Sequence, residues 1–367
     1  MQIDFANLKI QHNLYKEEIE EAILKVARDC NFIMGSQIDE LERNLEKFTG
    51  SKYAISCSSG TDALLLAMMA LDIQPDDEII TTPFTFFATA ETIAFLKAKP
   101  VFVDIDEKTY NIDPKKIEEK ISSKTKAIIP VSLYGQPCDM DEINQIAKKY
   151  NLKVIVDGAQ SFGSTYKGES DSNLGDISCT SFFPAKPLGC YGDGGALFTN
   201  DEKLADKIKS LRLHGQSIRY HHQYIGMGGR LDTIQAAVLN VKLKYYPKDL
   251  KLRQDVAEKY TKALNEKNIE TPFVKNDRTS AWAQYSIRVQ NRTELQTKLQ
   301  NLGIPTAVHY PMPLHVQECF KYLNLKEGDF PISEKVSKEI MSLPMNPYVT
   351  DEEIEFIVGS LAKELKC

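Results

Sequence analysis

The sequence has little of what marks membrane, secreted or nucleic-acid-binding proteins. No run of 18 apolar residues occurs in its 367 residues, so we expect no membrane span. Residues 1–18 lack the apolar stretch of a secretory signal, and the seven cysteines show neither a CxxC motif nor a Cys/His metal spacing. We therefore expect reduced thiols, a cytoplasmic location and no metal site. The net charge of −6 argues against a nucleic-acid partner, which would favour a basic face.

The chain does contain a long alternation of strand-like and helix-like segments. Between residues 53 and 213, short β-rich apolar runs alternate with amphipathic runs, which predicts an α/β fold with a mostly parallel sheet and helices on both faces. From about residue 250 the strand-like and helix-like segments become fewer, in an α+β pattern. We expect a large domain over residues 1–247, including an N-terminal helical segment, and a smaller C-terminal α+β domain over residues 248–367.

Individual elements follow from the same periodicity. Helices are expected over residues 16–29, 38–48 and 231–262, the last one broken near Pro247, and again over 333–344. The other expected elements are the strands 53–59, 77–83, 99–105, 125–134, 153–160, 179–184, 194–200 and 280–289, and the helices 60–71, 86–98, 139–151, 201–213 and 294–303.

Lys186 and Asp157 form the most informative pair in the chain. Lys186 lies among apolar residues between a strand and a glycine-rich turn, where a desolvated amine suits a Schiff base with an aldehyde. Asp157 ends an apolar strand, where a carboxylate needs a partner such as a protonated pyridine nitrogen, and Gln160 could donate to the ring's phenolic oxygen. Together they indicate pyridoxal phosphate. Taken alone, Asp157 would more often cap a helix, and Lys186 would be an ordinary surface lysine.

Polar residues follow several predicted strands, and in an open α/β sheet that edge binds ligands. Gly60 and Thr61 begin a helix whose free N–H groups favour a phosphate, and Ser181 could add a hydroxyl. A plain helix cap explains Gly60 and Thr61 equally well. Phe86 could stack on a pyridine ring, and core packing explains it equally well.

Two later segments carry candidate ligands with ordinary alternatives. Arg230 precedes a helix and could hold a carboxylate in a bidentate fork, or it could form an ion pair with Asp232 or another acid. His221 and His222 are adjacent, so they point in different directions on any regular element. A surface loop suits these two histidines better than a shared ligand role.

These motifs together resemble the DegT/DnrJ-type nucleotide-sugar aminotransferases, which are fold-type-I pyridoxal-phosphate enzymes. The resemblance runs nearly end to end, through SSGTDALLLAM, DEIITTPFTFFATAE, KPVFVDID, VSLYGQP, VDGAQSFG, SFFPAKPLGCYGDGGA, GRLDTIQAAVL and HYPMPLH. It implies a homodimer with active sites at the subunit interface. It also implies that Lys186 is the Schiff-base lysine, that Asp157 binds the pyridine nitrogen and that Gln160 lies near the phenolic oxygen.

The resemblance further assigns Thr61 and Ser181 to the phosphate and Phe86 to the face of the ring. Because the family's dehydratase branch has histidine at the lysine position, the lysine here favours transamination. Two positions depart from the family pattern. Ala185 stands where serine is common, and Gly228 stands where an asparagine commonly reaches the partner subunit's phosphate. That side-chain contact must be absent here or supplied in another way.

The sequence looks most like the branch that aminates C3 of a 3-keto nucleotide sugar, with L-glutamate as the amino donor. We expect a UDP-linked 2-acetamido-3-oxo sugar, with uronic acids included. A dTDP-linked 3-keto sugar, a 4-keto sugar, a sugar dehydratase and a cofactor-binding regulator are the alternatives. Arg230 would hold the carboxylate of glutamate or a uronate, and His309, Tyr310 and His315 would line the nucleotide-sugar side. Such enzymes serve polysaccharide or lipopolysaccharide biosynthesis.

Overall fold

The fold is built on a seven-stranded sheet. In the computed structural model, which describes residues 3–365, the strand order is β1-β9-β8-β5-β4-β2-β3. Neighbouring strands are parallel, except that β9 runs antiparallel to β1 and β8. The strands are β1 (Tyr53–Cys57), β2 (Glu78–Thr81), β3 (Lys99–Phe102), β4 (Thr125–Ile128), β5 (Lys153–Asp157), β8 (Ile177–Ser181) and β9 (Gly195–Thr199). The predicted mostly parallel α/β sheet is therefore confirmed.

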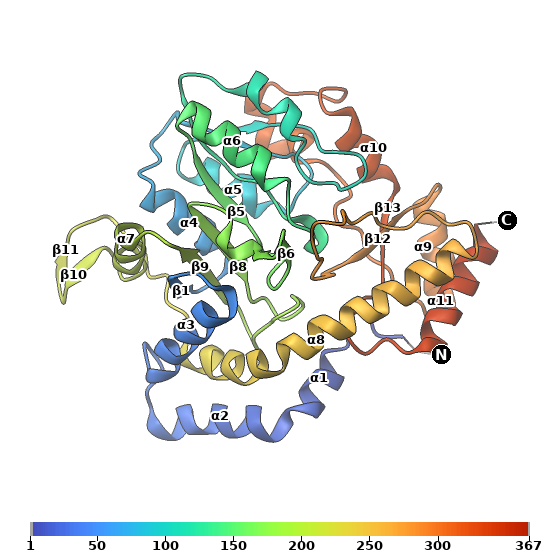
Figure 1. Cartoon of the computed structure of the whole chain (residues 1–367), viewed down its shortest axis with the longest axis horizontal. Helices are drawn as coiled ribbons and strands as arrows, with labels where there is room; N and C mark the ends of the chain where they lie inside the picture. The colour runs from blue at the N-terminus through green and yellow to red at the C-terminus, as the bar shows by residue number, and fades with distance from the viewer. Residues whose placement is uncertain (1–2, 366–367) are drawn as a thin grey trace.

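Helices cover both faces of this sheet (Figure 1). Helices α4 (Gly60–Ala70), α5 (Ala88–Phe95) and α7 (Glu202–Arg212) share one apolar core with the strands. Helices α3 (Ser36–Thr49), α6 (Met140–Tyr150) and the first half of α8 (Thr233–Asn265) contribute to cores on the other face. Strand β5 shows why both faces must be covered: Ile155 points into the first core, whereas Val154 and Val156 point into the second.

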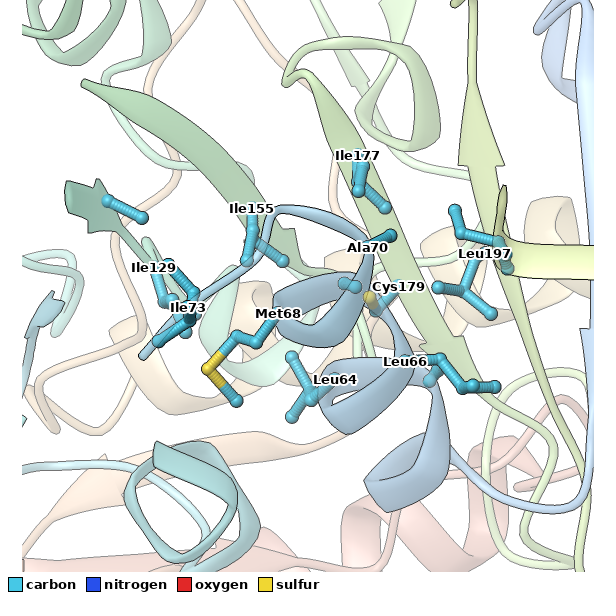
Figure 2. Close-up of a cluster of buried hydrophobic side chains, with 14 of the residues drawn as sticks. Leu64, Leu66, Met68, Ala70, Ile73, Ile129, Ile155, Ile177, Cys179 and Leu197 are labelled. Carbon is cyan, nitrogen blue, oxygen red and sulfur yellow. The ribbon is translucent and has the colours of Figure 1, made fainter. Parts of the chain in front are cut away.

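Helix α4 is apolar nearly all round because it lies between the sheet and other helices. Figure 2 shows Leu64, Leu66 and Met68 on different sides of α4, within one cluster that includes Ile155, Cys179 and Leu197 of the strands. All of these side chains are buried, and burial of each large one stabilises the fold by about 1.5–3 kcal/mol. The packing fixes the first turn of α4 beside the carboxyl end of β8, where the predicted phosphate site lies.

A second core lies at the C-terminal end of the chain. The second half of α8, α9 (Arg292–Asn301) and α11 (Asp351–Glu364) pack there around an antiparallel pair, β12 (Tyr285–Arg288) and β13 (Ile340–Leu343). A capping box, in which Thr350 and Glu353 bond each other's backbone N–H, begins α11. Ile3 also lies in this core, so the N-terminal segment contacts the C-terminal elements.

The remaining elements are short or peripheral. They are α1 (Leu8–Leu14), α2 (Lys16–Asp29) and α10 (Pro331–Glu339), the hairpins β6 (Thr165–Tyr166) with β7 (Glu169–Ser170) and β10 (Gln216–Ile218) with β11 (His221–His222), and the 3₁₀ turns η1 (Pro114–Lys116), η2 (Glu118–Lys120), η3 (Leu133–Gly135), η4 (Asp171–Asn173), η5 (Leu314–Val316) and η6 (Glu318–Leu323). The β10–β11 hairpin projects from the body next to α7 (Figure 1). No helix within residues 3–365 is long and apolar enough to cross a membrane.

Two predictions about local structure are wrong. Helix α8 does not break at Pro247 but continues to Asn265. Pro247 is exposed, and the single hydrogen bond that its ring removes, to the carbonyl of Leu243, does not end the helix, because both halves of α8 are packed into cores. The helix predicted over 333–344 ends at Glu339, because Ile340–Leu343 pair with β12. Strand pairing and burial thus override the helical periodicity of that segment.

Helix α8 crosses the expected domain boundary without interruption. Its residues Leu239 and Leu243 belong to a core of the large sheet, whereas Val256 and Tyr260 belong to the C-terminal core. We propose that the boundary at 247/248 lies inside this helix, with residues 3–5 added to the C-terminal side. The helix would then link the two parts as a rigid element rather than as a flexible linker.

Candidate active site

Asp157 is held rigidly at the carboxyl end of β5. It is buried, and its Oδ2 accepts a hydrogen bond from Thr89 Oγ1 at 2.7 Å, while its Oδ1 accepts one from the backbone N–H of Ala159 at 3.2 Å. Burial raises the pKa of the Asp157 carboxyl, an effect that these two hydrogen bonds and the charge of Lys186 oppose. Thr89 was not identified from the sequence, because nothing in a helical ATAET segment indicates which threonine faces the strand edge.

Gln160 lies in the turn that follows Asp157, and both ends of its amide are used. Its Oε1 accepts from the backbone N–H of Tyr134 at 2.7 Å, and its Nε2 donates to the hydroxyl of Tyr310 at 3.0 Å. Tyr134 in turn donates its hydroxyl to the carbonyl of His309. The structure therefore connects the predicted residues Gln160, His309 and Tyr310, and it adds Tyr134, which sequence reasoning missed.

Lys186 lies in a tight turn after β8. Its backbone N–H donates to the carbonyl of Phe183 at 2.8 Å, and its side chain is partly exposed and has no hydrogen bond or ion pair within residues 3–365. The expectation that apolar neighbours bury the segment holds only in part, because Phe183 and Ala185 are exposed. The Lys186 amine is nevertheless desolvated enough to lower its pKa, with the charge of Asp157 opposing this. A less basic, unpaired amine is suited to nucleophilic attack and proton transfer.

The first turn of α4 forms a cradle next to Ser181. Ser59 caps the helix by accepting from Asp62 N–H at 3.0 Å, which leaves the N–H groups of Gly60 and Thr61 without a partner in the described chain. A Cβ on Gly60 would come within 2.7 Å of the Cβ of Ser181, so only glycine lets the two elements approach this closely. Two free N–H groups, a hydroxyl and the positive end of a helix suit a phosphate.

Phe86 and the 309–310 segment lie over this edge of the sheet. Phe86 is 54% exposed, so it does not pack in the core, in contrast to the fully buried Phe84. Its ring centroid is 6.0 Å from that of Tyr310. His309 bonds Ser342 Oγ through Nδ1 at 2.9 Å, and burial, followed by the charge of Lys186, lowers the pKa of His309 to about 4. His309 is therefore neutral at physiological pH.

Arg230 has no ionic partner within residues 3–365, although the sequence offered Asp232 for that role. One of its terminal nitrogens lies 3.9 Å from the position that a Cβ on Gly228 would occupy. The ring of His214 approaches the same position to 3.1 Å, so His214 fills part of the space left by the missing side chain. A partly exposed guanidinium without a carboxylate partner is available to an anionic ligand.

His315 does not join the other predicted residues. Its side chain is 1% exposed and contacts the ring of Phe330, and its Nε2 lies 3.0 Å from Glu334 Oε1. A histidine that is covered and paired in this way cannot line a substrate site, so this prediction is corrected to a structural role. His221 and His222 are exposed and form the second strand of the projecting hairpin rather than a loop.

The site thus offers the parts that pyridoxal phosphate needs, on one edge of the sheet. The N–H groups at Gly60 and the hydroxyl of Ser181 suit the phosphate of the cofactor. The buried carboxylate of Asp157 suits its protonated pyridine nitrogen, and the unpaired amine of Lys186 suits its aldehyde. The fold and this donor set define a fold-type-I pyridoxal-phosphate enzyme.

Comparison with known proteins identifies the family. The DegT/DnrJ/EryC1/StrS aminotransferase family matches residues 13–362, and the chain belongs to this family. It is 50% identical over 359 residues to the UDP-2-acetamido-2-deoxy-3-oxo-D-glucuronate aminotransferase of Pseudomonas aeruginosa, covering 98% of this chain and 99% of the relative. It is 42% identical to the dTDP-3-amino-3,6-dideoxy-alpha-D-galactopyranose transaminase of Aneurinibacillus thermoaerophilus, covering 98% of each.

Solved structures give the same answer. A DegT/DnrJ/EryC1/StrS aminotransferase from Brucella abortus superposes with a TM-score of 0.96 at 38% identity, covering 100% of both chains. NtdA from Bacillus subtilis, solved with bound cofactor PMP, superposes with a TM-score of 0.92 at 32% identity, covering 100% of this chain and 86% of the other. The protein is therefore a pyridoxal-phosphate-dependent aminotransferase, and the predicted fold, cofactor and enzyme class are confirmed.

Proposed function

We propose that this aminotransferase moves an amino group from L-glutamate to C3 of a UDP-linked 2-acetamido-3-oxo sugar, with a uronic acid as the preferred acceptor. The observation that carries the proposal is the unpaired Arg230, because an arginine without an acidic partner suits a ligand carboxylate. The 50% identity to an enzyme named for a 3-oxo-glucuronate supports the same acceptor. Glutamate and a uronate both carry a carboxylate, so one arginine could serve both halves of the reaction.

The residues divide the chemistry as follows. Pyridoxal phosphate, when bound, supplies an electron sink for the carbon that loses its proton. Lys186 Nζ would hold the cofactor at its aldehyde carbon, and as a free amine Lys186 would carry the proton from the α-carbon of the donor to that aldehyde carbon, on the other side of the shared nitrogen. Asp157 would keep a proton on the pyridine nitrogen through its buried carboxylate. In the second half-reaction Lys186 moves the proton in the opposite direction.

The other residues bind and orient. The N–H groups of Gly60 and Thr61 and the hydroxyl of Ser181 would hold the phosphate, and Phe86 would cover one face of the ring. Gln160 would place its amide near the phenolic oxygen. His309 and Tyr310 would line the sugar-nucleotide side, with His309 acting as a neutral hydrogen-bonding group because its pKa is about 4.

We further propose a cytoplasmic homodimer whose active sites lie at the subunit interface, serving polysaccharide or lipopolysaccharide biosynthesis. The projecting β10–β11 hairpin supports self-association, because it and the segment after it expose Ile218, Tyr220 and Ile225, the last at 92%. The six cysteines among the described residues are all free, as expected in a reducing compartment. Light scattering of the purified protein tests the dimer, and a mass near 41.4 kDa would reject it.

The decisive experiment is a stepwise assay of the purified holoenzyme. L-Glutamate alone should bleach the visible absorption of the bound cofactor and release 2-oxoglutarate. A panel of UDP- and dTDP-linked 3-keto and 4-keto sugars should then restore it, fastest with the UDP-linked 3-oxo uronate. NMR of the product should place the new amine on C3. Preference for a dTDP-linked sugar would favour the acceptor class of the second relative, and formation of a dehydrated sugar would reject transamination.

A further inference from the structure

A buried carboxyl behind the cofactor site has no role in the chemistry described above. Asp171, at the start of η4, is 1% exposed and accepts a serine hydroxyl on each carboxylate oxygen. Ser132 Oγ donates to Oδ1 at 3.1 Å, and Ser161 Oγ donates to Oδ2. Both serines are fully buried, so no solvent competes for these bonds. An ionised carboxylate suits this place because it accepts hydrogen bonds and donates none.

The two serines lie on the two loops that meet at the predicted ring site. Ser161 directly follows Gln160 in the turn after β5. Ser132 lies in the loop after β4, where its N–H donates to the carbonyl of Asp157 at 3.0 Å. Two residues later the same loop supplies the Tyr134 N–H that bonds Gln160. Asp171 therefore connects the two loops through the two serine hydroxyls, and Gln160 connects them a second time through its hydrogen bond with the Tyr134 N–H.

We propose that Asp171 is a positioning residue whose carboxylate ties the 157–161 turn to the 130–134 loop, and so sets where Asp157 and Gln160 meet the cofactor ring. This inference rests on the proposed function. Asp171 touches neither cofactor nor substrate and acts only through Ser132 and Ser161. The arrangement explains why a charge is kept at a buried position: an uncharged side chain there would leave one serine hydroxyl without an acceptor.

The charges around Asp171 make its ionisation dependent on pH. Burial, with a smaller contribution from the charge of Asp157, raises the pKa of Asp171 to about 6, although the two serine hydroxyls and the charge of Arg278 oppose the rise. Cys138 also faces this carboxyl, and its own pKa is raised well above the ordinary value by burial. Above pH 6 the carboxylate accepts both serine hydroxyls. Below pH 6 its proton must be donated, so one of the two bonds must reverse or break.

The chain offers a matched control in Asp104. It is also a buried carboxylate, 6% exposed, and it accepts the hydroxyl of Ser333 at 2.6 Å together with the N–H groups of Ile332 and Ser333. Asp104 holds the first turn of α10 and has no contact with the 157–161 turn. Asp104→Asn should therefore lower stability without changing the cofactor site.

The experiment compares the apo forms of the wild type, Asp171→Asn, Ser161→Ala and Asp104→Asn by titration with pyridoxal phosphate. Visible absorbance gives the affinity and the position of the band, and thermal unfolding gives the stability. We expect Asp171→Asn and Ser161→Ala to bind at least tenfold more weakly, with a shifted band. Asp104→Asn should stay within twofold of the wild type. The wild-type affinity should fall as pH drops through 6, and Asp171→Asn should lack that step.

Two results would overturn the inference. One is wild-type affinity and band position in Asp171→Asn, and the other is a loss confined to thermal stability, as in the control. If Asp171→Asn does not fold, Ser161→Ala, which removes one hydroxyl, decides the question by the same criteria. A wild-type protein that never binds the cofactor would instead reject the proposed function itself, so the two failures are distinguishable.

Discussion

The candidate active site has two halves that differ in how their polar groups are hydrogen-bonded. In the half we call closed, every polar side chain bonds another part of the protein; it consists of Thr89, Tyr134, Asp157, Gln160 and Asp171. In the half we call open, the functional groups have no protein partner within residues 3–365; it consists of Lys186, Arg230 and the N–H groups of Gly60 and Thr61.

The difference separates preorganisation from binding. A buried polar group without a partner costs about 1–3 kcal/mol, so the closed half could not exist without its hydrogen bonds. The groups of the open half are partly exposed, so water can hydrate them until a ligand binds, and leaving them without a protein partner costs less free energy. We infer that the closed half sets the electronic state of the ring and that the open half holds the groups that arrive and leave.

Replacing Lys186 should have the largest effect. Lys186→Ala should fold normally and lower turnover by about 10⁴-fold or more, because the only amine in the open half is lost. Single-turnover absorbance with L-glutamate is the measurement. A half-reaction that keeps its wild-type rate in this variant would remove Lys186 from the chemistry.

Asp157 tests the closed half. Asp157→Asn should slow the half-reaction by about 10²–10³-fold, the range for removing one preorganised electrostatic partner, while Lys186 still reacts with the cofactor. Thr89→Val should give a smaller loss in the same direction, because it removes only one of the two hydrogen bonds to Asp157. Equal rates in Asp157→Asn and the wild type would show that this carboxylate does not serve the ring.

Arg230 tests the open half. Arg230→Ala should raise KM for glutamate and for an acidic sugar by about 10–100-fold, matching the loss of a charge-assisted hydrogen bond worth about 1.5–3 kcal/mol. Its effect on an acceptor without a carboxylate should be small. Arg43→Ala on the exposed face of α3 is the control. Unchanged KM values in Arg230→Ala would mean that the carboxylates bind elsewhere.

Replacing His315 tests whether this residue lines the substrate side or only stabilises the fold. His315→Ala should lower the free energy of unfolding by about 2 kcal/mol, because it removes a buried ring and its bond to Glu334, while KM for the sugar nucleotide stays unchanged. Urea unfolding of this variant and of the exposed-site control His221→Ala measures the effect. A rise in KM without loss of stability would return His315 to the substrate side.

The expected effect of His309 is confined to the pH dependence of stability. Its pKa is 6.5 in an unfolded chain and about 4 in the folded one, so the unfolded chain binds the extra proton first as pH falls. The free energy of unfolding should therefore decrease between pH 6.5 and pH 4. In His309→Gln this part of the decrease should disappear, as measured by urea unfolding at several pH values. An unchanged slope would show that His309 ionises normally.

Much of the fold followed from the sequence because its signals are local. Strand and helix periodicities placed the sheet, α2, α3 and α4 correctly, and the polar residues at strand ends indicated the edge that carries Asp157 and Lys186. The errors came where non-local contacts prevailed. Residues 340–343 became a strand because β12 lies beside them, and Pro247 stayed within α8 because the packing of both halves of this helix outweighs the loss of one hydrogen bond.

The candidate site divides in the same way. Sequence alone predicted the lysine, the aspartate and the glycine-rich helix start as site residues, since each chemical task permits few residue types at those places. Only the tertiary structure showed that Thr89 bonds Asp157, that Tyr134 bonds Gln160 and that Ser161 bonds Asp171. It also showed that Arg230 lacks an ionic partner within residues 3–365 and that His315 is buried against Glu334. A serine, threonine or histidine has many possible partners along the chain, and its role depends on which distant segment folding brings within hydrogen-bonding distance.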